Sequence, residues 1–262
     1  MSETVRLSDR MTAILDMIPS GRRCLADIGC DHALLSIAYA IREGYGEGTS
    51  SYPVVALDVN AGPLEAARRN VSAYGLSSVI DIRLSDGFDA LGNGEADTVV
   101  IAGMGGRLMM DILDMGLGRL DPGALLILSP QSDIYEFRRY LAERDIGIIG
   151  EDFVKDEGKF YNILICNYSG EKVSFQEKSS TDTSDKDSTA FDREVDLMYG
   201  KCLIDTGSAV LEEYLMRRLD SLNGVFCHLS GVDSDKAADR LLQIRHECAL
   251  TERALERVKA NK

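Results

Sequence analysis

Short apolar runs alternate with segments of helical periodicity through the first part of the chain. The strand-like runs lie near residues 23–28, 53–58, 79–84, 96–102 and 123–129. The helix-like segments lie near residues 8–18, 32–43, 61–74, 105–116 and 132–144. Ser8, Asn60 with Pro63, and Gly75 stand where helix ends are expected. Apolar strands separated by helices predict an α/β fold, with a parallel sheet covered by helices on both faces.

Two consecutive strand-like runs end this alternation. Residues 146–154 and 160–166 are joined by the polar segment 155–159, which predicts a β-hairpin. The sheet would then finish with an antiparallel pair, whereas a plain dinucleotide-binding fold would continue in parallel. Five parallel strands closed by a hairpin resemble the Rossmann-like fold of class I methyltransferases.

The remaining chain changes composition twice. Residues 169–190 are rich in Ser, Thr, Asp and Lys, which cannot bury a core and therefore predict a flexible linker. Helical segments follow at about 191–222 and 234–260. We therefore expect a methyltransferase-like domain over residues 1–168, a linker over 169–190 and a helical domain over 191–262.

Both C-terminal helical segments carry an apolar stripe. The second has a heptad-like stripe at Ala237, Leu241, Ile244, Cys248, Thr251, Leu255 and Val258. The first has leucines at positions 211, 215, 219 and 222. A coiled-coil-like antiparallel hairpin turning near Asn223–Gly224 would bury one stripe against the other. Such a helical pair either packs only on its own core or forms an arm that grips a large substrate.

Length and composition are those of an ordinary globular protein with one core and an appendage, since the chain has 262 residues, 45% hydrophobic and 27% charged. No apolar run approaches the ~18 residues of a membrane span. The first residues contain no apolar signal core, so we expect a cytoplasmic protein. The six cysteines have no C-x-x-C spacing and there are three histidines, which predicts reduced thiols and no metal site.

The net charge of −14 argues at first against a nucleic-acid partner. Its distribution weakens that argument, because residues 1–24 and 236–262 are each net basic and the acidity lies between them. A local basic face therefore remains open, beside the simpler interpretation that the acidity serves solubility.

The stretch Leu25–Ser36 carries the clearest chemical signal. An apolar run contains Asp27, Gly29 makes a turn, and Asp31 and His32 precede a helix-like run. Ligands of open α/β sheets bind where strands end, and a glycine there lets backbone approach them. A dinucleotide-binding turn requires three glycines for a pyrophosphate, and this turn has one. Two carboxylates instead favour a ligand with a positive charge and hydroxyls, such as S-adenosylmethionine.

Acids also follow the second and third strands. Asp58, followed by Val59, could accept both ribose hydroxyls of a nucleoside. Asp86, with Gly87, could accept the amino group of an adenine, although Asp-Gly is also a common turn. Acids at three successive strand ends are more specific than any one of them.

The fourth and fifth strands are followed by turns of another kind. Ala102, Gly103, Met104 and Gly105 would leave backbone exposed beside the ligand, with Met104 as an apolar wall, or would only ease the turn. After the fifth strand, Pro130 stiffens the turn and Gln131 could bond the edge of a base.

With these residues assembled, the chain resembles the bacterial tRNA (adenine-22-N1)-methyltransferase family. The matching motifs are Leu7–Arg10, Ile18–Pro19, Ala26–Ala33, Gly62–Pro63, Asp86–Gly87, Ile101–Gly106, Leu128–Gln131, Gly158–Tyr161 and, more weakly, Tyr199–Leu203. The chain departs from the family where Asp58 replaces a Glu and where Leu-Ser-Pro-Gln replaces Leu-Gln-Pro-Asn at residues 128–131.

The resemblance implies S-adenosylmethionine as the methyl donor and N1 of an adenosine in the D-loop of tRNA as the acceptor. We assign Asp31 as the catalytic carboxylate, and place Pro130, Gln131 and His32 on the substrate side. Arg6 and Arg10 are expected to bind tRNA, so that replacing them would weaken binding and flatten its salt dependence.

Other functions stay open at this point. The first alternative is a methyltransferase for a small molecule or protein, with the helical arm serving dimerisation. The second is a non-catalytic module that binds S-adenosylmethionine or RNA. A nicotinamide oxidoreductase is disfavoured by the missing G-x-G-x-x-G and by the terminal hairpin. The oligomeric state is left open, with a slight preference for a monomer.

Overall fold

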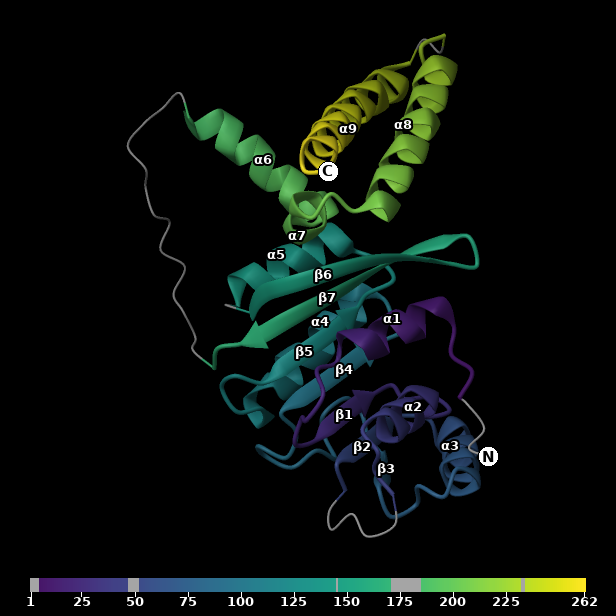
Figure 1. Cartoon of the computed structure of the whole chain (residues 1–262). Coiled ribbons are helices and arrows are strands. Elements are labelled where there is room, and N and C mark those ends of the chain that lie inside the picture. Colours follow the sequence, from purple (N-terminus) through teal and green to yellow (C-terminus); the bar gives the residue numbers. More distant parts are fainter. Residues whose placement is uncertain (1–4, 47–51, 145, 171–184, 232–233) are drawn as a thin grey trace. The chain divides into compact units, whose positions relative to one another are not determined.

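A seven-stranded sheet forms the centre of the first of two compact units, Met1–Ser174 and Phe175–Lys262 (Figure 1). The computed structural model describes residues 5–46, 52–144, 146–170, 185–231 and 234–262. The strands are β1 (Leu25–Ile28), β2 (Val54–Asp58), β3 (Ile80–Leu84), β4 (Thr98–Ala102), β5 (Leu125–Ser129), β6 (Ile146–Asp156) and β7 (Lys159–Tyr168). The α/β class and the order of strands and helices predicted from the sequence are confirmed.

The sheet has the order β3-β2-β1-β4-β5-β7-β6. Strands β1 to β5 pair in parallel, and β7 pairs antiparallel with both β5 and β6. The strand order reverses direction between β1 and β4. In open α/β sheets such a switch point leaves a crevice at the carboxyl ends of the strands, where ligands bind.

Helices cover both faces of the sheet (Figure 1). They are α1 (Asp9–Met17), α2 (Leu34–Arg42), α3 (Ala61–Ala73), α4 (Gly106–Gly116) and α5 (Ile134–Glu143), with a 3-10 turn at Leu117–Arg119. One core lies between the sheet and α1, α2 and α3, and the other between the sheet and α4 and α5. Successive side chains of β7 point to opposite faces of the sheet and pack into different cores, Leu164 into one and Ile163 into the other.

The hairpin turn is tighter than the sequence predicted. The expected loop over residues 155–159 reduces to Glu157 and Gly158, because Lys155, Asp156 and Lys159 belong to the strands. Both turn residues have positive φ, 47° and 80°. A two-residue turn of this kind matches the twist of the strands that it joins, so the ladder continues to the turn.

The second unit contains four helices among its described residues: α6 (Asp185–Tyr199), α7 (Lys201–Asp205), α8 (Ala209–Leu229) and α9 (Asp235–Ala260). The single helix predicted over 191–222 is wrong, because Gly200 and Gly207 interrupt it with φ of 90° and 63°. Residues 185–190 are helical rather than part of a linker, and residues 171–184 of that predicted linker lie outside the described residues.

Helices α8 and α9 form the predicted antiparallel hairpin (Figure 1). The turn is not at Asn223–Gly224, which lie inside α8, but beyond Leu229. Of the predicted stripe, Ala237, Ile244, Thr251 and Val258, seven residues apart, are buried, whereas Leu241, Cys248 and Leu255 are only half-buried. Leu250 and Ala254 are buried as well, because α6 and α7 also pack on α9. The apolar face of α9 is therefore wider than a two-helix seam requires.

Candidate functional site

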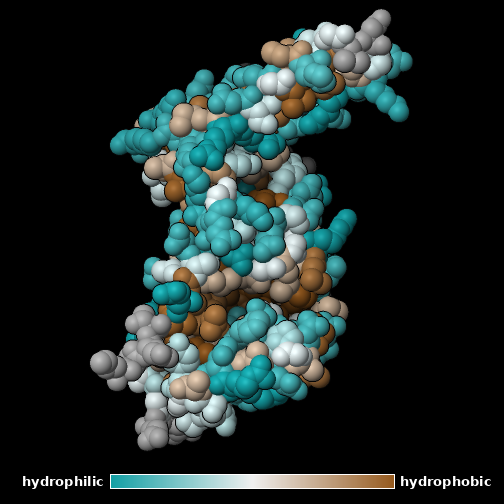
Figure 2. All heavy atoms as spheres, turned by 90° about the vertical axis from the view of Figure 1, so that its right-hand side faces the viewer, coloured by the Kyte–Doolittle hydropathy of each residue, from teal (hydrophilic) through white to brown (hydrophobic). Residues whose placement is uncertain are grey.

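A cavity of about 690 Å³ lies in the first unit, at the carboxyl ends of its parallel strands. Figure 2 views this side of the unit and shows hydrophobic side chains around a hollow. Every site residue predicted from the sequence lines the cavity except Gly105 and Pro130. The predicted lining residues are Arg6, Arg10, Asp27, Gly29, Asp31, His32, Asp58, Val59, Asp86, Gly87, Ala102, Gly103, Met104 and Gln131.

Asp27 lies at the base of the cavity and is only 5% exposed. Its carboxylate accepts a 2.6 Å hydrogen bond from the hydroxyl of Ser36, which is buried among apolar residues of helix α2. Burial, with a smaller contribution from the negative charge of Asp58, raises the pKa of Asp27 from 3.8 to about 6. The Ser36 bond opposes that shift. Ser36 was not predicted as a site residue, although a serine on an apolar face was a signal.

Replacing Asp27 with Asn is expected to stabilise the ligand-free protein at about pH 8. The folded state binds the Asp27 proton more tightly than the unfolded chain, because the pKa is raised from 3.8 to about 6. Stability therefore falls as the pH rises through that window, and stays lower above it. The cost of the buried charge is at most about 3 kcal/mol, at about 1.4 kcal/mol for each pKa unit. The amide oxygen that this substitution introduces can still accept from Ser36.

Urea unfolding at about pH 5 and pH 8 measures this effect. Asp27→Asn should be more stable than the wild type at the higher pH and should lose about half of that difference at the lower one, where the unfolded carboxyl is still ionised. Asp89→Asn is the matched control, because the Asp89 side chain is 75% exposed. A variant less stable than the wild type at pH 8 would show that the Asp27 charge stabilises the fold.

Asp58, the last residue of β2, organises the turns around the cavity. Its carboxylate accepts hydrogen bonds from the backbone N–H groups of Asp31, at 3.1 Å, and Asn60, at 2.8 Å. It is 8% exposed and lines the cavity. Each carboxylate oxygen retains capacity for a further donor, since an ionised carboxylate offers about four acceptor positions. Asp58 can therefore hold the turns and bind hydroxyls of a ligand together.

Glycines bring the backbone close to the cavity at two turns. Gly29 and Gly103 have φ of 76° and 83°, which strain any other residue. A Cβ atom at Gly29 would lie 2.9 Å from the Met104 methyl carbon, so Met104 packs over the first turn. Gly105 does not line the cavity. It is the N-cap of α4, and a Cβ there would lie 3.0 Å from the Ser132 hydroxyl, which gives this glycine a packing role.

Asp31 and His32 form an exposed pair at the cavity. The Asp31 carboxylate lies 2.7 Å from Nδ1 of His32, with side chains 67% and 51% exposed respectively. Asp31 has a left-handed φ of 50° and Ala33 one of 57°, which turns the chain sharply before α2 begins. A carboxylate with water on one side and the cavity on the other can accept a proton and release it to solvent.

The turn after β3 contains a residue that sequence reasoning missed. The Ser85 hydroxyl donates to the carbonyl of Gly87 at 2.9 Å and accepts from the N–H of Ala90 at 2.9 Å. It thereby holds the Asp86–Gly87 turn in a closed shape, and Ser85 itself lines the cavity. A serine directly before Asp-Gly was the signal, because short hydroxyl side chains stabilise turns.

The turn after β5 is tied to the turn after β4. The Gln131 N–H donates to the carbonyl of Met104 at 3.0 Å, and Gln131 is exposed at the cavity. Pro130 precedes it but does not contribute to the lining. Of this predicted pair, the structure therefore brings only Gln131 to the site.

Arg6 and Arg10 differ in their exposure to solvent. Arg6 is exposed at the cavity, whereas Arg10 on α1 is only 9% exposed. The Arg10 guanidinium carbon lies 4.7 Å from the centre of the Tyr161 ring on β7. Tyr161 belongs to a motif of the family resemblance, but the sequence suggested no role for it.

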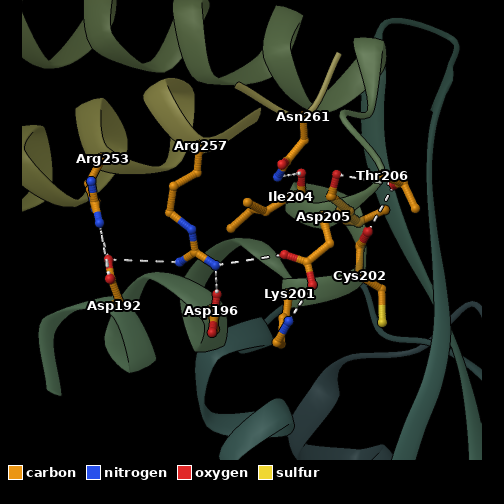
Figure 3. A network of polar contacts seen from close by, with 11 residues as sticks. Asp192, Asp196, Lys201, Cys202, Ile204, Asp205, Thr206, Arg253, Arg257 and Asn261 are labelled. Atoms are coloured by element: carbon orange, nitrogen blue, oxygen red, sulfur yellow. Dashed lines mark hydrogen bonds and ion pairs between the residues drawn. The ribbon is translucent and has the colours of Figure 1, made fainter. Parts of the chain in front are cut away.

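The basic residues of the last helix are largely engaged within the second unit (Figure 3). Arg253 lies 2.8 Å from Asp192, and Arg257 lies 2.9 Å from Asp196. Lys262 pairs with Glu212. The net basic character of this segment therefore does not create a free basic face at these three positions.

The described part of the chain also bears on metal binding, on membrane spans and on the cysteines. There, no group of three or more His, Cys, Asp or Glu side chains could hold a metal ion. No helix of that part is long and apolar enough to cross a membrane. All six cysteines are free thiols.

Comparison with known proteins gives one family. A model of the tRNA (adenine(22)-N(1))-methyltransferases, TrmK, matches residues 25–253. The tRNA (adenine(22)-N(1))-methyltransferase of Bacillus subtilis is 35% identical over 162 residues, which cover 62% of this chain and 65% of that relative. The chain thus spans just under two thirds of this curated relative in the alignment.

Solved structures extend the similarity over both units. The crystal structure of the Bacillus subtilis TrmK enzyme has a TM-score of 0.75 and 26% identity, covering 96% of this chain and 99% of that one. A Streptococcus pneumoniae protein, described as a candidate tRNA (m1A22) methyltransferase in complex with S-adenosyl-L-methionine, has a TM-score of 0.73 and 26% identity, with 95% and 100% covered. On its sequence and on its architecture, the chain belongs to the tRNA (adenine(22)-N(1))-methyltransferase family.

Proposed function

We propose that this protein transfers the methyl group of S-adenosylmethionine to N1 of adenosine 22 in tRNA. The observation that carries the proposal is the convergence of Asp27, Asp58 and Asp86, from three successive strands, on one cavity at the switch point of the sheet. Family membership supports the donor and the acceptor. We propose a cytoplasmic location with it, because a tRNA substrate would be met there.

The cavity fits the proposed donor in its chemistry. Asp58 would accept the ribose hydroxyls, and Asp86 the adenine amino group, while the exposed Val59 offers an apolar contact to the base. Gly29, Gly87, Ala102 and Gly103 would let backbone approach, and Asp27 would face the cationic end. The donor supplies an activated, electrophilic methyl group.

Asp31 is the proposed catalytic carboxylate. N1 of a neutral adenine carries an in-plane lone pair, and methylation there leaves a cation unless the N6 amino group loses a proton. The carboxylate of Asp31 would stabilise that charge or accept the N6 proton, and His32, 2.7 Å away, would orient it. Met104 and Gln131 line the same cavity and would contact the acceptor base, which must first leave its pairing and stacking partners.

Asp31→Asn is expected to lower kcat by about 100-fold or more, within the range of general acid–base catalysis. Asparagine tolerates the left-handed φ of this position, so the turn should keep its shape. Affinity for S-adenosylhomocysteine, measured by calorimetry, should stay within about threefold. An unchanged kcat would exclude Asp31 from the chemical step.

Arg6→Gln is expected to weaken tRNA binding and to reduce the slope of log K against log salt by about one unit. Arg6 is exposed at the cavity, where a phosphate of the bound RNA could displace counterions from it. Filter binding over a salt series measures both quantities. Arg139→Gln is the control, because Arg139 is exposed on α5 and does not line the cavity. Equal slopes for the two variants would exclude a phosphate contact at Arg6.

The function is tested with methyl-labelled S-adenosylmethionine and unmodified tRNA transcripts carrying adenine or guanine at position 22. Label in 1-methyladenosine from the adenine transcript alone would support reaction, atom and position together. Label in both transcripts would show that the methylated adenosine is at a position other than 22. No label in RNA, with the donor still bound, would instead favour a small-molecule or protein acceptor.

A further inference from the structure

Arg10 is a buried cation at the wall of the cavity. It lies one helical turn before Ile14 on the inward face of α1, and both residues are buried. Within the described residues, the structure gives its guanidinium no carboxylate partner, only the face of the Tyr161 ring at 4.7 Å. A buried charge without a counter-ion is costly. The Arg10 guanidinium is therefore available to bind an anion that enters the cavity.

Tyr161 holds the guanidinium at the correct edge of the sheet. Strand β7 runs antiparallel to β5, with Leu164 opposite Leu128, so its earlier residue Tyr161 projects toward the carboxyl edge. Alternation along β7 places Tyr161 on the face of Ile163, which belongs to the core shared with α1. Stacking on the ring restricts the plane of the guanidinium while leaving its N–H donors free.

The position of Arg10 relative to the acids indicates which anion it meets. Its Nη2 atom lies 3.7 Å from the site of a Cβ on Gly103, directly after β4. Asp86 follows β3 and Asp58 ends β2, both on the other side of β1 in the sheet order. A donor with its adenine at β3 and ribose at β2 would extend past β1 toward β4. Its amino-acid end would then arrive at Arg10.

We propose that Arg10, positioned by Tyr161, binds the carboxylate of the donor's amino-acid moiety. This assignment rests on the proposed function and replaces the tRNA contact expected from the sequence. A phosphate of the RNA is the other anion available at this site. The low exposure of Arg10, 9%, favours a ligand that lies inside the cavity over a backbone that runs across its mouth.

Calorimetry with two ligands tests the proposal without a methyl-transfer readout. The ligands are S-adenosylhomocysteine and its decarboxylated analogue, which lacks only the carboxylate. Wild-type protein should bind the first about 10- to 100-fold more tightly, the range for a hydrogen bond to a charged group. Arg10→Met should bind both with similar affinity. A preserved preference in Arg10→Met would overturn the proposal.

Tyr161 variants separate positioning from general packing. Tyr161→Phe keeps the ring and should preserve the preference for the carboxylate, whereas Tyr161→Leu should reduce it several-fold and raise the KM for the donor with little change in kcat. If Arg10→Met fails to fold, the wild-type comparison of the two ligands and the Tyr161 pair still decide the question. Equal binding of the two ligands by the wild type overturns the assignment.

The remaining outcomes distinguish the inference from the proposed function. If the wild type binds S-adenosylhomocysteine and methylates tRNA, but Arg10→Met keeps its ligand preference and loses tRNA affinity, Arg10 contacts RNA phosphate and only this inference fails. If the wild type binds neither ligand and transfers no methyl group, the proposed function fails with it.

Discussion

Asp58→Ala is expected to lower the affinity for S-adenosylhomocysteine by at least about 100-fold. The substitution removes a charged acceptor for two ribose hydroxyls, and each hydrogen bond to a charged group contributes about 1.5–3 kcal/mol. It also leaves the N–H groups of Asp31 and Asn60 without their acceptor, so both turns lose a restraint. The effect therefore combines a lost ligand contact with a less ordered site.

Isothermal calorimetry measures this loss, and thermal unfolding shows whether the variant keeps its fold. Asp89→Ala is the matched control, because it removes an acid that is 75% exposed and does not line the cavity. Its affinity for S-adenosylhomocysteine should equal that of the wild type. If Asp58→Ala binds within about threefold of the wild type, the ribose assignment at the end of β2 is wrong.

Arg138→Ala is expected to lower the free energy of unfolding of the first unit by about 3–5 kcal/mol. The Arg138 and Glu151 side chains are 3% and 1% exposed, and Nε lies 2.9 Å from a Glu151 carboxylate oxygen. A second donor, Nη2, bonds the side-chain oxygen of Asn162 at 2.8 Å. One side chain of α5 thus ties together both strands of the hairpin. Its removal would take the Arg138 charge away from the buried Glu151 carboxylate.

Two further variants isolate the cause. Arg139→Ala should change stability by less than about 0.5 kcal/mol, because that side chain is 58% exposed and its pair with Glu143 is a surface pair. Arg138→Met combined with Glu151→Leu should recover much of the loss, since a buried pair can often be replaced by apolar residues. The urea transition that shifts with S-adenosylhomocysteine reports the first unit. A loss below about 1 kcal/mol in Arg138→Ala would contradict the buried-pair interpretation.

Local patterns predicted most elements because burial repeats with the geometry of each element. Ser8 does cap α1, with its hydroxyl accepting from the N–H of Met11 at 3.4 Å. The same reasoning failed where backbone conformation outweighed periodicity. The helix predicted over residues 191–222 runs across Gly200 and Gly207, yet their positive φ ends the helices there. Asn223 and Gly224 had the composition of a turn, but they lie exposed inside α8.

The candidate site shows the same division. Asp27, Asp58 and Asp86 could be recognised together because parallel strands end at one edge, so acids at strand ends must meet there. Sequence position also suggested that Arg6 and Arg10 would act alike, four residues apart. The structure decides otherwise, since Arg6 precedes α1 and is exposed, whereas the inward face of α1 buries Arg10 against a strand from much later in the chain.

By itself, the sequence determined the fold class, the positions of the strands and the acids at their ends, because these depend on the alternation of apolar and polar residues over a few positions. Only the tertiary structure decided which distant side chains meet. Tyr161 reaches Arg10 because β7 turns back along β5, and the cations of α9 are neutralised because α6 and α7 pack beside it. Such pairings depend on strand order and helix packing, which no local pattern encodes.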